Sequence, residues 1–251
     1  MPLAGRAALV SGAASGIGRA TAIRLAADGA LVGCLDRDGD GATRTAAGIE
    51  AAGGRAIGLT ADVTDPAAID TAVGTLVGAR PDGRALVDVL VNNAGVPGGG
   101  AFVDIDHAEW RRVIDVHVDG AFHLTQAVLP GMLDASWGRI VNVSSESVWL
   151  GNQSVQYVTA KAALIGFTRS LAYQVAPAGV RVNAVAPGPV ATPMLLDGDP
   201  GNIEAERRTV RIGRFLEPEE IAATIAFLVG PGGDGYVGQV LSPNGGTVFP
   251  G

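Results

Sequence analysis

The chain contains a single cysteine, Cys34, and a single lysine, Lys161, in 251 residues. One cysteine excludes an internal disulfide and a metal cluster held by several thiolates, and we expect no metal site. Cys34 lies in an apolar run, which predicts a small buried side chain. Lys161 stands out because arginine occupies every other Lys or Arg position. Codon bias alone would account for scarce lysine, so the surroundings of Lys161 must decide whether it has a chemical role.

Basic stripes and long hydrophobic runs are also missing. The formal net charge of −7 argues against a general nucleic-acid binder and against attraction to an anionic membrane, and favours small-molecule chemistry. Apolar runs such as 7–10 and 87–91 are far shorter than the ~20 residues of a membrane helix. The N-terminus shows no charged segment followed by an apolar secretory segment, so we expect a cytoplasmic protein.

Short strand-like runs alternate with segments of helical period along the whole chain. The expected strands are 7–10, 30–35, 56–60, 87–91, 139–143, 180–184 and 237–241. The expected helices are 18–28, 41–52 and 66–78, and further ones lie within 106–133, 154–176 and 218–229. The strands are apolar on both faces, as in a sheet covered by helices on both sides. We therefore predict an α/β protein with a Rossmann-type, doubly wound, seven-stranded parallel sheet, in a single domain over residues 1–251.

Two segments are expected to be loops at the carboxyl edge of the sheet, where ligands bind in such folds. The first is the glycine-rich stretch 96–100, and the second is the irregular span 188–214, which we predict to be a substrate loop.

A glycine-rich turn follows the first expected strand and reads Ser-Gly-Ala-Ala-Ser-Gly-Ile-Gly over residues 11–18. Gly12, Gly16 and Gly18 permit a tight turn, close approach of backbone N–H groups to a pyrophosphate, and close packing of helix on strand. Asp36 ends the second strand, where a carboxylate accepts hydrogen bonds from an adenosine ribose and repels a 2′-phosphate. This pattern favours NAD over NADP. Alternatively, Asp36 belongs to a solvated Asp-Arg-Asp turn, and Arg37 beside it would weaken the discrimination.

Other strand ends carry residues suited to the same ligand. Asp62 and Val63 follow the third strand and are candidates for contact with adenine. The turn Asn92-Asn-Ala-Gly95 follows the fourth strand and suits close approach of backbone to a cofactor, although an ordinary turn would use the same residues.

Tyr157 and Lys161 are spaced i, i+4, which places both side chains on one face of a helix. A phenol has a reference pKa of ~10, and a nearby ammonium favours its ionised form. Arginine would keep the charge but has a larger, planar fork, which offers a physical reason for a lone lysine. For an isolated pair, a tyrosine and a lysine on a surface helix would be the simpler interpretation.

Together these motifs resemble the short-chain dehydrogenase/reductase family, in its shorter single-domain form, over essentially the full chain. The resemblance rests on Gly12-x-x-x-Gly16-Ile17-Gly18, Asn92-Asn-Ala-Gly95, Gly138-Arg-Ile-Val-Asn-Val-Ser-Ser145, Tyr157-x-x-x-Lys161 and Val182-Asn-Ala-Val-Ala-Pro-Gly-Pro-Val-Ala-Thr192. It implies that Tyr157 is the general acid/base, that Lys161 lowers its pKa and binds the nicotinamide ribose, and that a serine holds the substrate oxygen. It also implies a homotetramer.

The resemblance extends to the cofactor-binding residues. It implies that residues 187–192 line the nicotinamide and that Thr192 binds its carboxamide. The expected cofactor-binding residues are Gly12, Ser15, Gly16, Ile17, Gly18, Asp36, Asp62, Val63, Asn93, Ala94, Gly95, Tyr157, Lys161, Pro187, Gly188, Val190 and Thr192.

The chain departs from the family pattern in three places. Ser11 replaces the usual threonine and keeps the hydroxyl. The usual distance from serine to tyrosine selects Ser144, whereas alignment of the strand selects Ser145, which we prefer because a strand fixes side-chain direction by its two-residue period. His117 stands where the family usually has asparagine. We expect His117 to relay protons between Lys161 and solvent and to add a pH dependence near its reference pKa of ~6.5, or else to be a packed helix histidine.

We therefore predict an NAD(H)-dependent oxidoreductase, an alcohol dehydrogenase or ketone reductase, that interconverts a secondary alcohol and a ketone. Its catalytic residues are Ser145, Tyr157, Lys161 and His117. One alternative is a reductase of 3-oxoacyl thioesters on acyl carrier protein or CoA, an activity that the resemblance usually pairs with NADPH. Another is a non-catalytic dinucleotide sensor, which would not need the serine, tyrosine and lysine together.

The substrate is less constrained by the sequence. Apolar residues in the two segments that should flank the nicotinamide suggest an apolar substrate, unless they pack in the core or a lid: Trp149, Leu150, Val155, Met194, Leu195 and Leu196. One basic cluster could contact a CoA phosphate or form a solvated helix face: Arg207, Arg208, Arg211 and Arg214.

Overall fold

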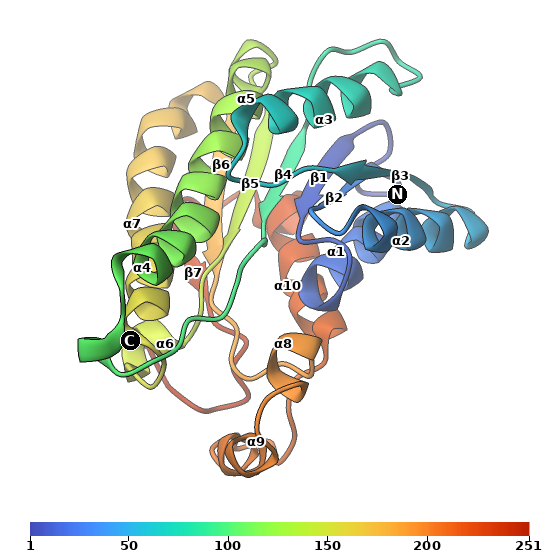
Figure 1. The fold of residues 1–251 in the computed structure, drawn as a ribbon. Coiled ribbons are helices and arrows are strands. Elements are labelled where there is room, and N and C mark those ends of the chain that lie inside the picture. The colour runs from blue at the N-terminus through green and yellow to red at the C-terminus, as the bar shows by residue number, and fades with distance from the viewer. Residues whose placement is uncertain (251) are drawn as a thin grey trace.

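A seven-stranded parallel sheet with helices on both faces forms the body of the protein (Figure 1). The computed structural model describes residues 1–250. The strands are β1 (Ala7–Ser11), β2 (Leu31–Asp36), β3 (Arg55–Thr60), β4 (Val89–Asn92), β5 (Gly138–Val143), β6 (Val180–Val185) and β7 (Val240–Leu241). They lie in the order β3-β2-β1-β4-β5-β6-β7, so the predicted Rossmann-type class and the single domain are confirmed.

The helices follow the strands in the order expected for a doubly wound fold. They are α1 (Gly16–Ala27), α2 (Gly39–Ala51), α3 (Pro66–Gly78), α4 (His107–Ile114), α5 (Gly120–Asp134), α6 (Ser147–Leu150), α7 (Val155–Val175), α8 (Pro193–Leu196), α9 (Pro200–Arg207) and α10 (Pro218–Val229). Aspartates begin several of them; the Asp65 carboxylate, for example, accepts hydrogen bonds from the backbone of Ala67 and Ala68 ahead of Pro66. Within residues 1–250, no helix is both long and apolar enough to cross a membrane.

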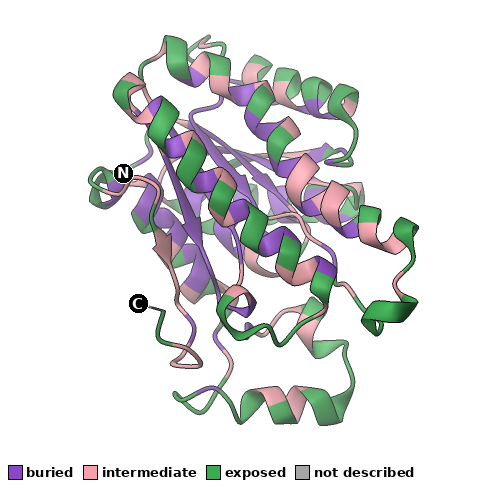
Figure 2. Cartoon of the chain, turned by 90° about the vertical axis from the view of Figure 1, so that its left-hand side faces the viewer, coloured by how far each residue is buried: buried purple, intermediate pink, exposed green. Residues whose placement is uncertain are grey.

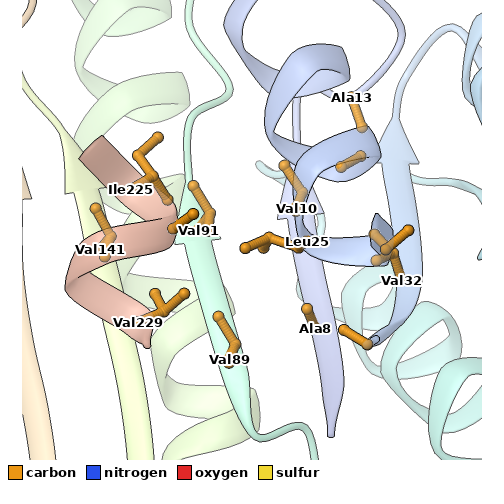
Figure 3. Close-up of a cluster of buried hydrophobic side chains, with 14 of the residues drawn as sticks. Ala8, Val10, Ala13, Leu25, Val32, Val89, Val91, Val141, Ile225 and Val229 are labelled. Atoms are coloured by element: carbon orange, nitrogen blue, oxygen red, sulfur yellow. The ribbon is translucent and has the colours of Figure 1, made fainter. Parts of the chain in front are cut away.

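Strand residues alternate between two apolar layers, because successive side chains of a strand point to opposite faces. In β1, Ala8 and Val10 pack toward α1 and α10, whereas Leu9 packs toward α3 and α5. Figure 3 shows the first layer, with Ile225 and Val229 of α10 beside β4 and β5. In Figure 2 the sheet is almost wholly buried between helices whose outer faces are exposed. This burial on both faces explains why the strands read as continuous apolar runs.

Two expectations about local structure were wrong. The last strand was expected over 237–241 but forms only at Val240 and Leu241; Gly238 has a φ of +66°, which breaks the extended backbone just before it. The span 188–214 was expected to be irregular but contains α8 and α9, each with a proline in its first turn. Both helices extend away from the sheet, at the bottom of Figure 1.

Candidate active site

A cavity of about 730 Å³ lies at the carboxyl ends of the strands. Its walls come from the turns after β1, β2, β3, β4, β5 and β6, from α7, and from the α8–α9 segment. The strand order reverses between β1 and β4, which is where ligands bind in open α/β sheets. Every expected cofactor-binding residue lines this cavity except Gly18.

Gly18 does not line the cavity, and its surroundings support the packing role that the sequence also indicated. A Cβ atom at Gly18 would lie 2.0 Å from the carbonyl oxygen of Gly12, so only glycine allows α1 to begin this close to β1. Gly12 and Gly16 do line the cavity, and both have positive φ, +68° and +52°. The turn thus leaves an open backbone surface of the kind a pyrophosphate requires.

The Ser11 hydroxyl joins the turn after β1 to the turn after β4. It accepts hydrogen bonds from the backbone N–H groups of Asn93 and Ala94 at 3.0 and 3.1 Å. The Asn93 side-chain amide donates in turn to the Ser11 carbonyl oxygen at 2.9 Å. The replacement of threonine by serine therefore retains the hydroxyl that holds these two cavity walls together.

The position of Asp36 is compatible with both interpretations that the sequence left open, a ribose contact and a place in an Asp-Arg-Asp turn. Its carboxylate accepts a hydrogen bond from the backbone of Ala14 in the glycine turn, at 3.0 Å, and another from the backbone of Asp38, also at 3.0 Å. The residue also lines the cavity, as does Arg37. A carboxylate has about four lone-pair positions, so two bonds of this kind leave it able to accept from a ribose diol.

Tyr157 and Ser145 both line the cavity, and the Ser145 side chain lies near enough to the Tyr157 phenol to influence its pKa. Burial raises the pKa of Tyr157 to about 12, and the nearby Ser145 side chain acts in the opposite direction. The resemblance implied a lowered pKa, whereas burial is the dominant influence in this structure and keeps the phenol protonated at neutral pH. A protonated phenol is ready to donate a proton to a substrate oxygen.

Ser144 and Ser145 lie in different surroundings. The Ser144 hydroxyl is buried and donates to the backbone oxygen of Lys161 in α7 at 2.8 Å. The Ser145 hydroxyl, beside Tyr157, accepts from the backbone of Ser147 at 3.2 Å. This geometry favours Ser145 as the serine that contacts a substrate oxygen, and Ser144 as a link between β5 and α7.

Lys161 lies one helical turn beyond Tyr157 and is buried. Its Nζ donates to the backbone oxygen of Val143 at 2.8 Å and lies 5.5 Å from the centre of the Tyr157 ring. Burial lowers the pKa of Lys161 to about 7. The ammonium can therefore gain or lose a proton near neutral pH, close to the phenol.

His117 lies in a π-helical turn, Asp115–Asp119, between α4 and α5. Such turns interrupt α-helices frequently at functional sites. The Nε2 atom is 3.1 Å from the backbone nitrogen and 2.9 Å from the backbone oxygen of Val96, and the ring packs edge-on against Tyr157 with centroids 5.5 Å apart. The buried Nδ1 atom has no hydrogen-bond partner within residues 1–250. The proton relay through His117 stays a prediction.

The surroundings of His117 argue against the pH dependence of turnover near pH 6.5 that we expected from this residue. Burial, followed by the charge of Lys161, lowers the pKa of His117 to about 3. The imidazole is therefore neutral across the working pH range, and its titration affects folding in acid instead of turnover near neutrality.

His117→Asn is expected to make the protein more resistant to acid than the wild type. In the unfolded chain, His117 binds a proton as the pH falls below ~6.5, the reference pKa of histidine. In the folded chain it binds this proton only near its lowered pKa. The contribution of His117 to stability is therefore lost as the pH falls between these two pKa values. Between pH 7 and pH 4.5 the loss amounts to about 2 to 3 kcal/mol. Urea unfolding of the variant and the wild type at both pH values measures this loss. It is the change with pH in the difference between their free energies of unfolding. The exposed His107 supplies the control His107→Asn; equal pH responses of the two variants would contradict the assignment.

The far end of the cavity is more polar than the sequence suggested. Met194 and Leu195 line it as expected, but four other apolar residues are exposed and lie outside it: Trp149, Leu150, Val155 and Leu196. The single turn of α6 and the start of α7 direct the first three to the surface. Polar residues that sequence reasoning missed line the cavity here: Glu146, Ser147, Asn152, Gln153 and Glu206.

The basic cluster lies outside the cavity. Arg207 and Arg208 form ion pairs with Glu204 on the same helix, and Arg214 pairs with Glu220. None of the four arginines lines the cavity, including Arg211. The solvated helix face is therefore the better interpretation.

Known proteins match both the sequence and the fold. The short chain dehydrogenase family profile matches residues 6–200. The short-chain reductase protein NovJ of Streptomyces niveus is 41% identical, covering 95% of this chain and 92% of its own. A 3-oxoacyl-[acyl-carrier-protein] reductase of Synechocystis is 38% identical, covering 98% of both chains. The crystal structure of a short-chain type dehydrogenase/reductase from Mycobacterium marinum superposes with a TM-score of 0.92 at 30% identity, covering 99% of this chain and 97% of the other.

These matches, together with the cavity where the strand order reverses, define an oxidoreductase that binds a nicotinamide dinucleotide. The chain belongs to the short-chain dehydrogenase/reductase family.

Proposed function

We propose that the protein is an NAD(H)-dependent oxidoreductase that interconverts a secondary alcohol and a ketone. The observation that carries this proposal is that Ser145, Tyr157 and Lys161 line one cavity, with the Lys161 Nζ 5.5 Å from the centre of the Tyr157 ring. A dinucleotide sensor would have no need of two such hydroxyl groups in one cavity beside a buried lysine.

The residues of the cavity fit the dinucleotide. Gly12 and Gly16 would hold the pyrophosphate by their backbone, Asp36 the adenosine ribose, and Thr192 the carboxamide. The bound nicotinamide supplies or accepts the hydride. Substrate enters from the side of α8 and α9, so we propose 188–214 as the substrate loop.

The hydroxyl groups of Ser145 and Tyr157 hold the substrate oxygen from two sides. In the reducing direction, the Tyr157 Oη–H donates its proton to that oxygen as the carbonyl becomes an alcohol. Lys161, whose pKa is near neutrality, then returns a proton toward the phenolate.

The proposal is tested by following absorbance at 340 nm with both cofactors, each in both oxidation states, against a panel of secondary alcohols, ketones and 3-oxoacyl thioesters. The thioesters represent the second candidate function, which the name of the Synechocystis relative favours. Failure of every substrate with both cofactors would leave the sensor as the better interpretation. A homotetramer is proposed from the family resemblance alone.

NADH is expected to be used with a kcat/KM at least on the order of 10-fold above that of NADPH, because Asp36 would lose a ribose hydrogen bond and repel a 2′-phosphate. Asp36→Ala should narrow the gap. Asp40→Ala, at an exposed position in the first turn of α2, is the matched control and should leave the ratio unchanged. Equal or better turnover with NADPH by the wild type would contradict the cofactor assignment.

A further inference from the structure

Two glutamates lie at the substrate end of the cavity, and the mechanism above uses neither. Glu146 follows Ser145 directly and is 5% exposed, and its backbone donates to the Pro187 oxygen at 3.0 Å. One of its carboxylate oxygens accepts from the Thr247 hydroxyl. Glu206 comes from the last turn of α9 and is half-buried. Both residues line the cavity, and the charge of Glu206 acts on Glu146, so α9 and the turn after β5 bring the two carboxyl groups near each other.

Charge links these carboxyl groups to each other and to the reacting hydroxyl. Burial is the main cause of the raised pKa of Glu146, and the charge of Glu206 raises it further. The charge of Glu206 also contributes to the raised pKa of Tyr157. Glu206 therefore lies within electrostatic reach of both the second carboxyl group and the phenol.

No basic side chain balances the two carboxyl groups. Neither glutamate forms an ion pair within residues 1–250. Arg207 and Arg208 follow Glu206 directly in the sequence, but both pair with Glu204 on the outer face of α9 instead. The described residues that line the cavity include one arginine, Arg37, and one lysine, Lys161. Arg37 follows β2, three strand positions from β5, or about 14 Å at the usual spacing between strands. Lys161 donates to Val143.

A third polar group in the cavity wall, the Ser147 hydroxyl, has no hydrogen-bond partner among the described residues. Ser147 is 2% exposed and lines the cavity, and its hydroxyl makes no hydrogen bond within residues 1–250. Buried polar groups without partners are costly, and at a cavity wall such a group points to a ligand that completes its hydrogen bonds. Two carboxylates and a free hydroxyl together suit a ligand that donates several hydrogen bonds and carries positive charge.

We propose that the substrate carries a protonated amino group, which Glu146 and Glu206 bind while its carbonyl oxygen lies between Ser145 and Tyr157. This inference rests on the proposed function and names its substrate class: amino ketones and the corresponding amino alcohols. An ammonium donates three hydrogen bonds and neutralises carboxylates that otherwise have no ion-pair partner among the described residues. The same end of the cavity repels anionic substrates, because like charges in a partly buried site are poorly screened.

The test compares three ketones of matched shape and different charge: 4′-(aminomethyl)acetophenone, 4′-methylacetophenone and 4-acetylbenzoate. At pH 7.5, with the preferred cofactor, the wild type is expected to show a kcat/KM for the cationic ketone that exceeds the value for the anionic ketone by on the order of 10-fold or more. Glu206→Gln and Glu146→Gln should each reduce this ratio several-fold. Glu204→Gln is the matched control, on the same helix but outside the cavity, and should leave the ratio as it is.

Equal turnover of the cationic and anionic ketones, or a ratio that the control variant changes as much as Glu206→Gln does, would overturn the inference. If the enzyme reduced none of the three ketones, the result would count against the proposed function. A binding measurement without turnover then tests the inference separately. Isothermal titration of benzylammonium and benzoate into the enzyme with bound cofactor should give tighter binding of benzylammonium, weakened in Glu206→Gln. Equal binding, or tighter binding of benzoate, would contradict the inference even in an inactive protein.

Discussion

Lys161→Arg is expected to lower kcat on the order of 10²-fold or more, although it keeps a positive charge. The Lys161 ammonium is buried and donates to the Val143 oxygen at 2.8 Å. The larger, planar guanidinium has a different reach and cannot take the same position without moving α7 or β5. It also never loses its proton, whereas the lowered pKa of Lys161 allows proton exchange near neutrality. Steady-state kcat for the best ketone of the screen measures the effect.

The exposed Arg169 on the same helix provides the matched control, because Arg169→Lys makes the reverse exchange away from the cavity and should leave kcat near that of the wild type. Thermal unfolding of both variants separates a damaged site from a damaged fold. If folded Lys161→Arg turned over at a near-wild-type rate, the lone lysine would have no chemical role.

Ser145→Ala is expected to reduce kcat/KM by on the order of 10²-fold, the usual cost of losing one hydrogen-bond donor at a reacting oxygen. The variant removes the hydroxyl near Tyr157, one of the two that we propose to hold the substrate oxygen. Ser144→Ala should retain far more activity but lower stability by about 1 kcal/mol, because it removes a buried bond to the backbone of α7.

Kinetics and urea unfolding of both variants test this difference. We expect the larger loss of activity in Ser145→Ala and the larger loss of stability in Ser144→Ala. Activity lost mainly in Ser144→Ala, with Ser145→Ala nearly unaffected, would show that the spacing to Tyr157 identified the correct serine and that the strand alignment did not. Equal losses in both would indicate that the turn after β5 depends on each hydroxyl.

Most of the sheet was predictable because its strands are short apolar runs between glycine turns and capped helices. The expected helices 66–78 and 218–229 agree with the observed α3 and α10 because a proline follows an acidic residue at the start of each. The sequence predicted β7 poorly, since Gly238 breaks a run whose residues otherwise favour a strand. Helix α9 was missed because its residues lack an apolar stripe.

The cofactor end of the site followed from the motifs more fully than the substrate end did. Glycines, Asp36, Tyr157 and Lys161 lie on elements whose geometry is set by strand order and helical period. The surroundings that shift a pKa depend on packing between distant segments, so neither the lowered pKa of His117 nor the raised pKa of Tyr157 could be derived from spacing. Glu206 had no signal at all, because its position depends on a helix that the pattern did not reveal.

The orientation of α9 has an evolutionary consequence. Successive residues of a helix are about 100° apart around its axis, so Glu206 faces inward while Arg207 turns outward to Glu204. Loss of one residue from the connection 197–199 would shift this helix by one position and carry Arg207 to the place that Glu206 now holds. A lineage of such enzymes could thereby exchange cationic for anionic substrates while its sheet, its glycine turn and its reacting hydroxyls stayed unchanged.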